Sequence, residues 1–417
     1  MTRAHADLHV ALYSGIYVRH DAVSNSLTCK LDVLDGLNRL GARVDTTVFA
    51  QASDFHAPFI RAAPNAATLF GHDEFWRADA HMFEFGMRYE IFDAVFVVPP
   101  GRPIMVTEHN TTPPELVDVP EVKRGCELSI LQRHNLALAY RVACDSEFNV
   151  ELDRSIGIPE DRLAVLHLPP AHVAASRRRS DFGSFDGPVR LLFLGRFVRA
   201  KGVADLLDAV GTLWAAGDDR FTLTLAGNPR FSDPLVMDQV ERGLDRHGGA
   251  GRLSLVATPS DEHIAELLAE SDVLVIPSYH EGYCVPVVEA YTAGCYVVGY
   301  GAGNLPNVVG GLGTLVPTGD VAGLTEALRD VVGRLSSAGV GVAPVRMPTA
   351  SGDADFATWS AAVARHLEDY SASAYTRRFI SLVADLAEAS PAGLSGNLRT
   401  AMDARLDELS GASEVTP

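Results

Sequence analysis

Short apolar runs alternate with helix-length amphipathic segments along most of the chain. In the first half, the runs predicted to be buried strands are "HVALYSG", "RVDTTVFA", "DAVFVVPP", "PIMVTEHN", "RVACDSE" and "RLAVLHL". In the second half they are "VRLLFLGR", "FTLTLAGN", "RLSLVATP", "SDVLVIPS", "CYVVGYGA" and "GTLVPTGD". Continuous apolar strands with helices between them are typical of parallel sheets covered on both faces. Two successive arrays predict an α/β protein with two tandem, doubly wound, Rossmann-like domains.

The segments between the strands set the expected domain limits. In the second half, helices are predicted near residues 202–216, 234–247, 261–270, 286–294 and 321–335. The polar, glycine-rich stretch 176–189 lacks apolar periodicity and marks the boundary between domains at 1–180 and 181–355. Residues 356–390 are predicted to form one or two helices. The weakly patterned residues 391–417 are expected to be a tail, partly disordered.

Composition restricts the classes of function. The net charge of −18 argues against nucleic acid as the main partner. The five cysteines are scattered without a CxxC pair, so neither a disulfide scaffold nor a zinc site is indicated. No apolar run reaches the ~20 residues of a membrane span, and the N-terminus lacks the pattern of a signal peptide. We expect a cytoplasmic protein without a transmembrane segment, for which peripheral membrane contact stays open.

Two glutamates flank the predicted start of a helix in "SYHEGYCVPVVEAYTAG". Pro286 suits a first helical turn, so the helix should begin near Val285, with Glu281 in the preceding loop and Glu289 about one turn inside. The free N–H groups at the helix start make an anion site, and Gly282 lets a ligand approach the backbone. A phosphate there would have hydroxyl-accepting carboxylates on both sides, as a sugar, a diphosphate and a ribose require. Alternatively, the two acids are a helix N-terminal acid and a solvated helix residue.

A second loop of the same domain carries cations. In "LLFLGRFVRAKG", a strand leads into Gly195 and Arg196, and Lys201 precedes the next helix. A guanidinium fork and an ammonium together suit a diphosphate. The alternative is two ordinary surface cations.

Together with "LAGNP", "NLPNVV" and "GTLVPTGD", these stretches resemble the retaining nucleotide-sugar glycosyltransferases of family four, which have the GT-B fold. The resemblance implies that Arg196 and Lys201 bind the donor diphosphate, that Glu281 bonds the donor sugar, and that Glu289 bonds the ribose. It also implies contacts from the backbone of Gly282, Tyr283, Cys284 and Val285 to sugar and phosphate. Two positions depart from the family: Cys284 stands where glycine is commonest, and Asn307 where glutamate often follows the proline.

In the first half, "HNTTPP" resembles a subset of this family that acts in cell-surface polysaccharide assembly. His109, at the end of a strand, would then contact the donor sugar near the reacting centre. Alternatively, it is a strand-end histidine packed against the residues that follow. Glu108 is interpreted as a structural or rim residue, and Ser146 as a helix N-cap. The loop after the first strand, with Gly15 and His20, is expected to line the acceptor site.

The sequence thus predicts a hexosyltransferase that moves a sugar, with retention, from a nucleoside-diphosphate sugar to a hydroxyl acceptor. The acceptor could be a glycan, a lipid-linked glycan or a small molecule. Front-face attack without metal or cofactor is expected, in a cleft between the domains, and the resemblance implies that the C-terminal helices cross back to the first domain. The alternatives are a sugar-nucleotide epimerase of the same fold and a non-catalytic sugar-nucleotide-binding subunit. A dehydrogenase is disfavoured because no GxGxxG turn follows a first strand.

Overall fold

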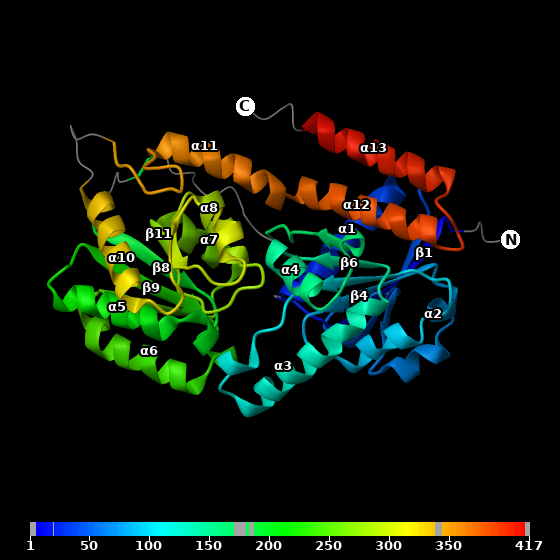
Figure 1. Ribbon diagram of the computed structural model, residues 1–417, viewed down its shortest axis with the longest axis horizontal. Coiled ribbons are helices and arrows are strands. Elements are labelled where there is room, and N and C mark those ends of the chain that lie inside the picture. Colours follow the sequence, from blue (N-terminus) through cyan, green and yellow to red (C-terminus); the bar gives the residue numbers. More distant parts are fainter. Residues whose placement is uncertain (1–5, 20, 171–180, 183–186, 338–343, 413–417) are drawn as a thin grey trace. The chain divides into compact units, whose positions relative to one another are not determined.

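The computed structural model describes residues 6–19, 21–170, 181–182, 187–337 and 344–412. The chain divides into two compact units. Unit 1 contains residues up to Thr111, Gly125–Pro169, and the residues from Ser371 onward; unit 2 contains Thr112–Arg124 and Pro170–Tyr370. Each unit has its own parallel sheet with helices against it (Figure 1). Most of the predicted boundary at 176–189 lies outside the described residues.

Unit 1 has a seven-stranded sheet in the order β3-β2-β1-β4-β5-β6-β7. Its strands are β1 (Leu8–Tyr17), β2 (Val44–Ser53), β3 (Ile60–Ala62), β4 (Ala80–Phe85), β5 (Ile104–Glu108), β6 (Arg141–Cys144) and β7 (Leu163–Val165). Its helices are α1 (Ala22–Arg39), η1 (Ala66–Gly71), α2 (Asp73–Arg77), η2 (Glu90–Phe96), η4 (His134–Leu138), α4 (Glu147–Ser155), η5 (Glu160–Arg162), α12 (Ala372–Ala389) and α13 (Gly396–Ala412), while α3 (Pro120–Arg133) begins in unit 2 and ends in unit 1. The strand order reverses between β1 and β4, which makes a topological switch point where ligands of such sheets bind.

One face of the unit 1 sheet is covered by α1, α12 and α13. Leu34 and Leu37 of α1 are fully buried in the same cluster as Phe379 of α12 and Leu398 of α13. The helix α13 corrects the expectation of a partly disordered tail over the described part of 391–417. The apolar positions of α13 are too sparse to predict a helix from its sequence alone. The helix is stabilised by tertiary packing against α1 and α12 rather than by its intrinsic propensity.

The strand predictions for unit 1 include one run that is not a strand and omit β3 and β4. The first half of the run "DAVFVVPP" belongs to the 3-10 helix η2, which ends at Phe96, and no part of the run is a strand. The strand that takes its place in the sheet is β4, "AHMFEF", which was not predicted because His81 and Glu84 interrupt its apolar pattern. Both polar side chains are buried in β4, and each has a hydrogen-bond partner on another element. A strand whose buried polar side chains have hydrogen-bond partners is therefore not recognised from its hydropathy pattern.

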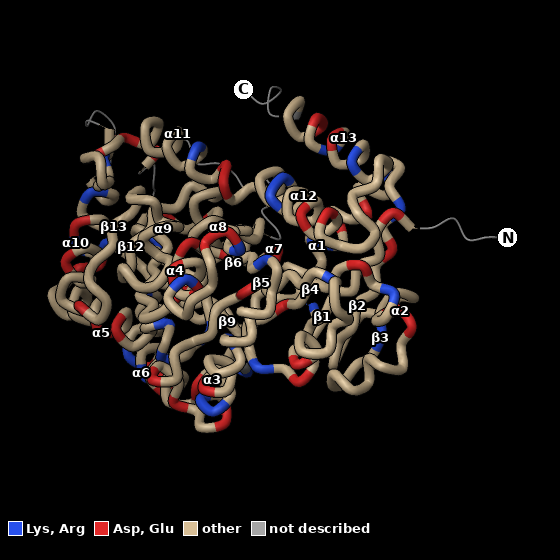
Figure 2. Tube along the Cα trace, turned by 45° about the vertical axis from the view of Figure 1, so that its right-hand side comes forward, with Lys and Arg blue, Asp and Glu red and all other residues tan. Residues whose placement is uncertain are grey.

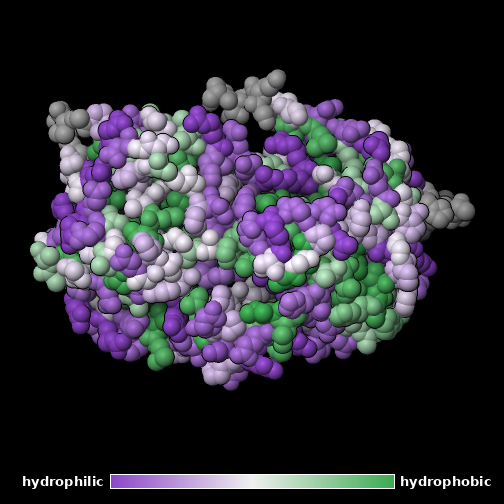
Figure 3. All heavy atoms as spheres, in the orientation of Figure 1, coloured by the Kyte–Doolittle hydropathy of each residue, from purple (hydrophilic) through white to green (hydrophobic). Residues whose placement is uncertain are grey.

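The surface of unit 1 around η1 and α2 is hydrophobic. Phe70 and Trp76 stack there with ring centroids 5.6 Å apart, and each is 47% exposed. Figure 3 shows the corresponding green area at the part of the surface where Figure 1 labels α2. Both rings of the stacked pair contact the fully buried Phe75, so these partly exposed rings pack against the local core.

Unit 2 has a six-stranded sheet in the order β10-β9-β8-β11-β12-β13. Its strands are β8 (Val189–Leu194), β9 (Phe221–Gly227), β10 (Leu253–Ala257), β11 (Val273–Ile276), β12 (Tyr296–Tyr300) and β13 (Thr314–Val316). Its helices are η3 (Pro114–Leu116), η6 (Arg199–Lys201), α5 (Val203–Ala215), η7 (Pro229–Phe231), α6 (Pro234–His247), η8 (Gly248–Ala250), α7 (Asp261–Glu270), α8 (Val285–Ala293), α9 (Leu305–Val309), α10 (Val321–Ser336), α11 (Phe356–Leu367) and η9 (Glu368–Tyr370). The predicted strands and helices of this half are therefore confirmed, and the short α9 is additional.

A glycine controls how closely two loops of unit 2 approach. Gly202 has φ 66°, and a Cβ there would lie 1.8 Å from the carbonyl oxygen of Pro277. Only glycine allows this contact, which draws the loop after β8 against the end of β11.

Figure 2 shows acidic and basic residues mixed along α6, in keeping with the sequence "PLVMDQVERGLDRH". Within the described segments, no helix is long and apolar enough to cross a lipid bilayer.

Candidate active site

The switch point of unit 2 brings a lysine and a glutamate together. Strands β8 and β11 are parallel neighbours, so the loops that follow them meet at one edge of the sheet. Lys201 Nζ lies 2.7 Å from Glu281 Oε1, and Ser278 Oγ donates a hydrogen bond of 2.7 Å to the same oxygen. The other carboxylate oxygen, Oε2, has no hydrogen bond among the described residues. Glu281 is therefore held by two donors and keeps one oxygen for a ligand.

The backbone around Glu281 is also fixed. The N–H of Asn304 donates to the carbonyl of Glu281 at 2.9 Å, and the Asn304 side chain donates to the carbonyl of Tyr283 at 3.1 Å. Asn307 in turn donates to the Asn304 side chain at 3.0 Å. Asn307, at the position where the family often has glutamate, therefore supports the loop from Glu281 to Tyr283 through Asn304.

Helix α8 begins at Val285, as predicted, and Pro286 lies in its first turn. Its N-cap residue, Cys284, has φ 75° and makes no side-chain capping bond. This left-handed conformation is costly for a residue with a Cβ, which explains why glycine is common there. Burial raises the pKa of the Cys284 thiol well above its ordinary value, so the thiol is neutral. The first turn of α8 thus offers N–H groups that no side chain of its N-cap satisfies.

Arg196 lies two residues after β8 and is exposed. Its guanidinium makes no hydrogen bond or ion pair with any residue in the described ranges. The structure therefore does not join Arg196 to the Lys201–Glu281 pair by a direct contact. A fork of free N–H donors on this loop remains available to an anion.

Glu289 lies on α8 and is half-buried. Its carboxylate has no hydrogen-bond or ion-pair partner within the part of the chain described. Burial, and secondarily the charge of Asp261, raise the pKa of Glu289 to about 7. A half-buried carboxylate without a partner is destabilising in the free protein, which is common where a ligand completes the site. It is not the solvated helix residue of the alternative interpretation.

The raised pKa of Glu289 predicts a pH-dependent stability. The folded protein holds this proton more tightly than the unfolded chain, so stability is lost as pH rises from about 4.5 to about 7. Glu289→Gln has no proton to lose, and its free energy of unfolding should exceed that of the native protein by about 1–3 kcal/mol above pH 7. Urea denaturation at pH 5 and pH 8 measures this difference. A difference that is the same at both pH values, or that equals that of the exposed Glu266→Gln, contradicts it.

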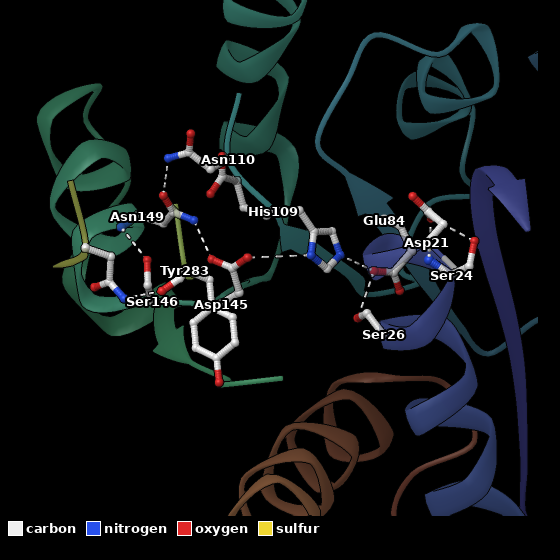
Figure 4. A network of polar contacts seen from close by, with 12 residues as sticks. Asp21, Ser24, Ser26, Glu84, His109, Asn110, Asp145, Ser146, Asn149 and Tyr283 are labelled. Carbon is white, nitrogen blue, oxygen red and sulfur yellow. Dashed lines mark hydrogen bonds and ion pairs between the residues drawn. The ribbon is translucent and has the colours of Figure 1, made fainter. Parts of the chain in front are cut away.

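In unit 1, His109 follows β5 and bridges two acids (Figure 4). Its Nε2 lies 2.6 Å from Glu84 Oε2, and its Nδ1 lies 3.8 Å from Asp145 Oδ2. Burial alone would lower the pKa of His109, but the contacts with Asp145 and Glu84 outweigh it and raise this pKa to about 9. The imidazole is therefore charged at neutral pH. It is not simply packed against the residues that follow, as the alternative interpretation had it.

The polar network continues beyond Asp145. Asn149 donates to Asp145 Oδ1 at 2.5 Å and accepts from the side chain of Asn110, which has φ 68° (Figure 4). Ser146 accepts from the backbone N–H of Asn149 at 3.2 Å and caps α4, as predicted. These residues follow β5 and β6, whose carboxyl ends meet at one edge of the unit 1 sheet.

Glu108 is a structural residue rather than a rim residue. Its side chain is fully buried and lies 3.5 Å from Arg133 Nη2. Burial raises the pKa of Glu108 to about 8, although Arg133 opposes this effect.

The two residues predicted on the acceptor side have different outcomes. Gly15 lies within β1 rather than in the loop that follows it, because the strand continues to Tyr17. The ring of Tyr89 covers Gly15 so closely that a Cβ would lie 2.0 Å from it. Gly15 is thus a contact point for an aromatic side chain, which the sequence did not indicate. His20 lies outside the described residues, and its predicted role stays a prediction.

No metal site is apparent in the segments described: they contain no group of three His, Cys, Asp or Glu residues that could hold an ion. Metal independence stays a prediction.

The sequence from β8 to α10 matches a known family. Residues 188–334 match the family described as "Glycosyl transferases group 1". These residues form a glycosyl transferases group 1 domain. The domain contains Arg196, Lys201, Glu281 and Glu289, so the four side chains of the predicted donor site all lie within the match.

Several curated relatives share part of this chain. The D-inositol 3-phosphate glycosyltransferase of Nocardioides sp. is 33% identical over 168 residues, which cover 38% of this chain and 37% of that protein. The O-antigen chain mannosyltransferase B of Escherichia coli is 32% identical over 143 residues, covering 33% and 36%. The 2-deoxystreptamine glucosyltransferase of Streptomyces kanamyceticus is 34% identical over 166 residues, covering 39% and 41%. The match therefore spans about two fifths of each of these relatives.

Solved structures resemble the chain over nearly its whole length. Sucrose-phosphate synthase from Thermosynechococcus elongatus has a TM-score of 0.64 at 18% identity, covering 91% of this chain and 99% of that chain. Anabaena Alr3699/HepE in complex with UDP-glucose has a TM-score of 0.61 at 14% identity, covering 91% and 100%. At these identities the likeness shows the fold, and the predicted GT-B architecture of two Rossmann-like parallel sheets is confirmed.

Proposed function

We propose that this protein is a retaining glycosyltransferase that moves a hexosyl group from a nucleoside-diphosphate sugar to a hydroxyl acceptor without a metal ion. The observation that carries the proposal is the Lys201–Glu281 pair at 2.7 Å, at the switch point of a group 1 domain and beside the start of α8. The cation and the helix N-terminus suit the diphosphate of a nucleotide sugar, and the carboxylate can accept a hydrogen bond from a hydroxyl of its sugar.

The proposed chemistry concentrates on the leaving group. When the glycosidic bond to the diphosphate breaks, negative charge develops on the phosphate oxygens. Lys201, Arg196 and the N–H groups of α8 would stabilise that charge without rearranging. Lys201 uses one of its three ammonium protons on Glu281 and keeps the others for phosphate.

Glu281 has the surroundings of a binding group rather than of a nucleophile. Two donors hold its Oε1, so the carboxylate is fixed and partly neutralised. Its Oε2 would accept a hydroxyl of the donor sugar. With Glu281 in this role, retention is best served by attack on the face from which the diphosphate leaves, and the departing phosphate takes the proton of the acceptor.

The names of the relatives support a nucleotide sugar as the donor and suggest which classes of acceptor to test. The Anabaena structure contains UDP-glucose, and the related proteins are named as mannosyl- and glucosyltransferases. One relative is named for an O-antigen chain and another for 2-deoxystreptamine, an aminocyclitol. A glycan, a lipid-linked glycan and a small polyhydroxylated molecule are the acceptor classes that we propose to test.

The test combines binding with product analysis. A panel of nucleotide sugars is screened by thermal shift, because a ligand at 100 times its Kd stabilises the folded state by about 2.7 kcal/mol. The best donor, radiolabelled in its sugar, is then incubated with acceptor pools. Transfer of label to an acceptor supports the proposal. Conversion of the free donor to an epimer favours the epimerase, and binding without any turnover favours the non-catalytic subunit.

A further inference from the structure

Behind His109 lies an ion pair that the proposed chemistry does not use. Lys30 on α1 and Glu84 on β4 are paired at 2.6 Å, with their side chains 0% and 1% exposed. Ser26, one turn before Lys30, accepts from Lys30 Nζ at 2.7 Å and donates to Glu84 Oε2 at 3.1 Å. The carboxylate of Glu84 therefore receives donors from α1 on one side and His109 on the other.

We propose that Glu84, anchored by Lys30 and Ser26, is a positioning residue that fixes the ring of His109 through Nε2 and leaves Nδ1 as the nitrogen that can donate to a ligand. The inference rests on the proposed function, in which His109 contacts the transferred sugar. The Nε2 contact is short, at 2.6 Å, whereas Nδ1 is 3.8 Å from Asp145, longer than a hydrogen bond. The ring is thus within hydrogen-bond distance of an acid at Nε2, while Nδ1 makes only the longer ion-pair contact with Asp145.

The order of charges supports a positioning role. Lys30, Glu84, His109 and Asp145 form a chain in which positive and negative groups alternate. If Glu84 only neutralised Lys30, one oxygen would suffice, and the second need not meet a histidine. Burial would raise the pKa of Glu84, but Lys30 and His109 hold it below its ordinary value, so the carboxylate stays charged.

The charged groups around His109 set its protonation. Glu84 faces it from β4 and Asp145 from the loop after β6, while Glu108 on β5 and Lys30 on α1 act from farther away. The two nearest groups are acids, and both favour the imidazolium. Held in this way, His109 acts as a fixed cation and hydrogen-bond donor toward the sugar, and not as a general base.

The first arm of the test is an NMR titration, which needs no enzyme activity. The protein is labelled at histidine, and the His109 signal is assigned with His109→Gln. The native His109 should titrate near pH 9, and Glu84→Gln should lower this pKa by about one unit or more because an opposite charge in contact is removed.

Asp79→Asn is the matched control. Asp79 immediately precedes β4, the strand that carries Glu84, and pairs with Arg102 at 2.6 Å. Asp79→Asn also removes one carboxylate charge from an ion pair, and the pKa of His109 should not change in this variant. If Glu84→Gln does not fold, the double variant Lys30→Met with Glu84→Gln removes both buried charges at similar volume and should lower the pKa likewise.

The second arm measures kcat/KM against pH with the best donor. The basic limb should move to lower pH in Glu84→Gln but not in Asp79→Asn. Glu84→Asp keeps the charge but withdraws the carboxylate by one methylene, so it should keep the native His109 pKa and still lose activity. An unchanged His109 pKa in Glu84→Gln and in the double variant, or full activity in Glu84→Asp, overturns the inference. Failure of the native protein to transfer sugar would refute the proposed function, while the titration would still decide the pairing.

Discussion

Replacing Lys201 with alanine is expected to lower sugar-transfer turnover by about 10²-fold or more, because a fixed donor to the leaving diphosphate is lost. The change also leaves Glu281, which is largely buried, with Ser278 as its remaining donor to Oε1. Turnover is measured at saturating donor, where loss of leaving-group stabilisation lowers kcat. Arg196→Ala should have a similar direction but leave Glu281 undisturbed, since the two side chains make no contact.

Arg199→Ala is the matched control for this prediction. Arg199 lies on the same 3-10 helix as Lys201, is exposed, and pairs with Asp118 at 3.2 Å instead of with Glu281. It removes the same charge from the same segment, and turnover should stay close to native because exposed pairs contribute little. Equal losses in Arg199→Ala and Lys201→Ala would mean that only the general positive potential matters. Near-native turnover in Lys201→Ala would remove this residue from the site.

Replacing Glu289 with alanine is expected to weaken nucleotide binding by about 10- to 100-fold, because this is the typical contribution of a hydrogen bond to a charged group. Calorimetry should be performed at pH 8, where Glu289, with a pKa of about 7, is ionised. A nucleoside monophosphate and diphosphate should lose affinity by the same factor, because the ribose is common to both. Lys201→Ala should instead weaken the diphosphate more.

A deoxy nucleotide isolates the contact. The native protein should bind the ribose form more tightly than the 2′- or 3′-deoxy form that lacks the recognised hydroxyl, and Glu289→Ala should abolish this preference. Exposed Glu266 on α7 supplies the control substitution to alanine. A preference that survives in Glu289→Ala would reject the ribose role. Glu289→Gln, which removes the charge but keeps the side-chain volume, should stabilise the free protein above pH 7, as expected for a carboxylate whose partner is a ligand.

The second half of the chain could be interpreted from its sequence because its signals are local. Continuous apolar strands gave β8 to β13, and Pro286 placed the start of α8 at Val285. Since β8 and β11 are adjacent, the pairing of Lys201 with Glu281 follows from two loops at one switch point. The preference for glycine at position 284 likewise has a local cause, the positive φ of Cys284.

The first half yielded less because its decisive contacts are not local. Glu84 was missed, since a carboxylate inside "AHMFEF" reads as an interruption of a strand until Lys30, 54 residues earlier, is known to face it. Lys30 itself occupies a buried position of α1, where an amphipathic pattern predicts an apolar residue. His109 was found through the resemblance, but its partners could not be. Packing of α13 against α1 was equally invisible, because it joins opposite ends of the chain.

The central claim is that a nucleoside-diphosphate sugar binds at the switch point of the group 1 domain. A crystal structure of the protein with a bound nucleoside diphosphate tests it most directly. We predict that the diphosphate lies within hydrogen-bond distance of Lys201, Arg196 and the first N–H groups of α8, with a ribose hydroxyl on Glu289. A nucleotide bound elsewhere, or one whose phosphates meet none of these groups, would contradict the account.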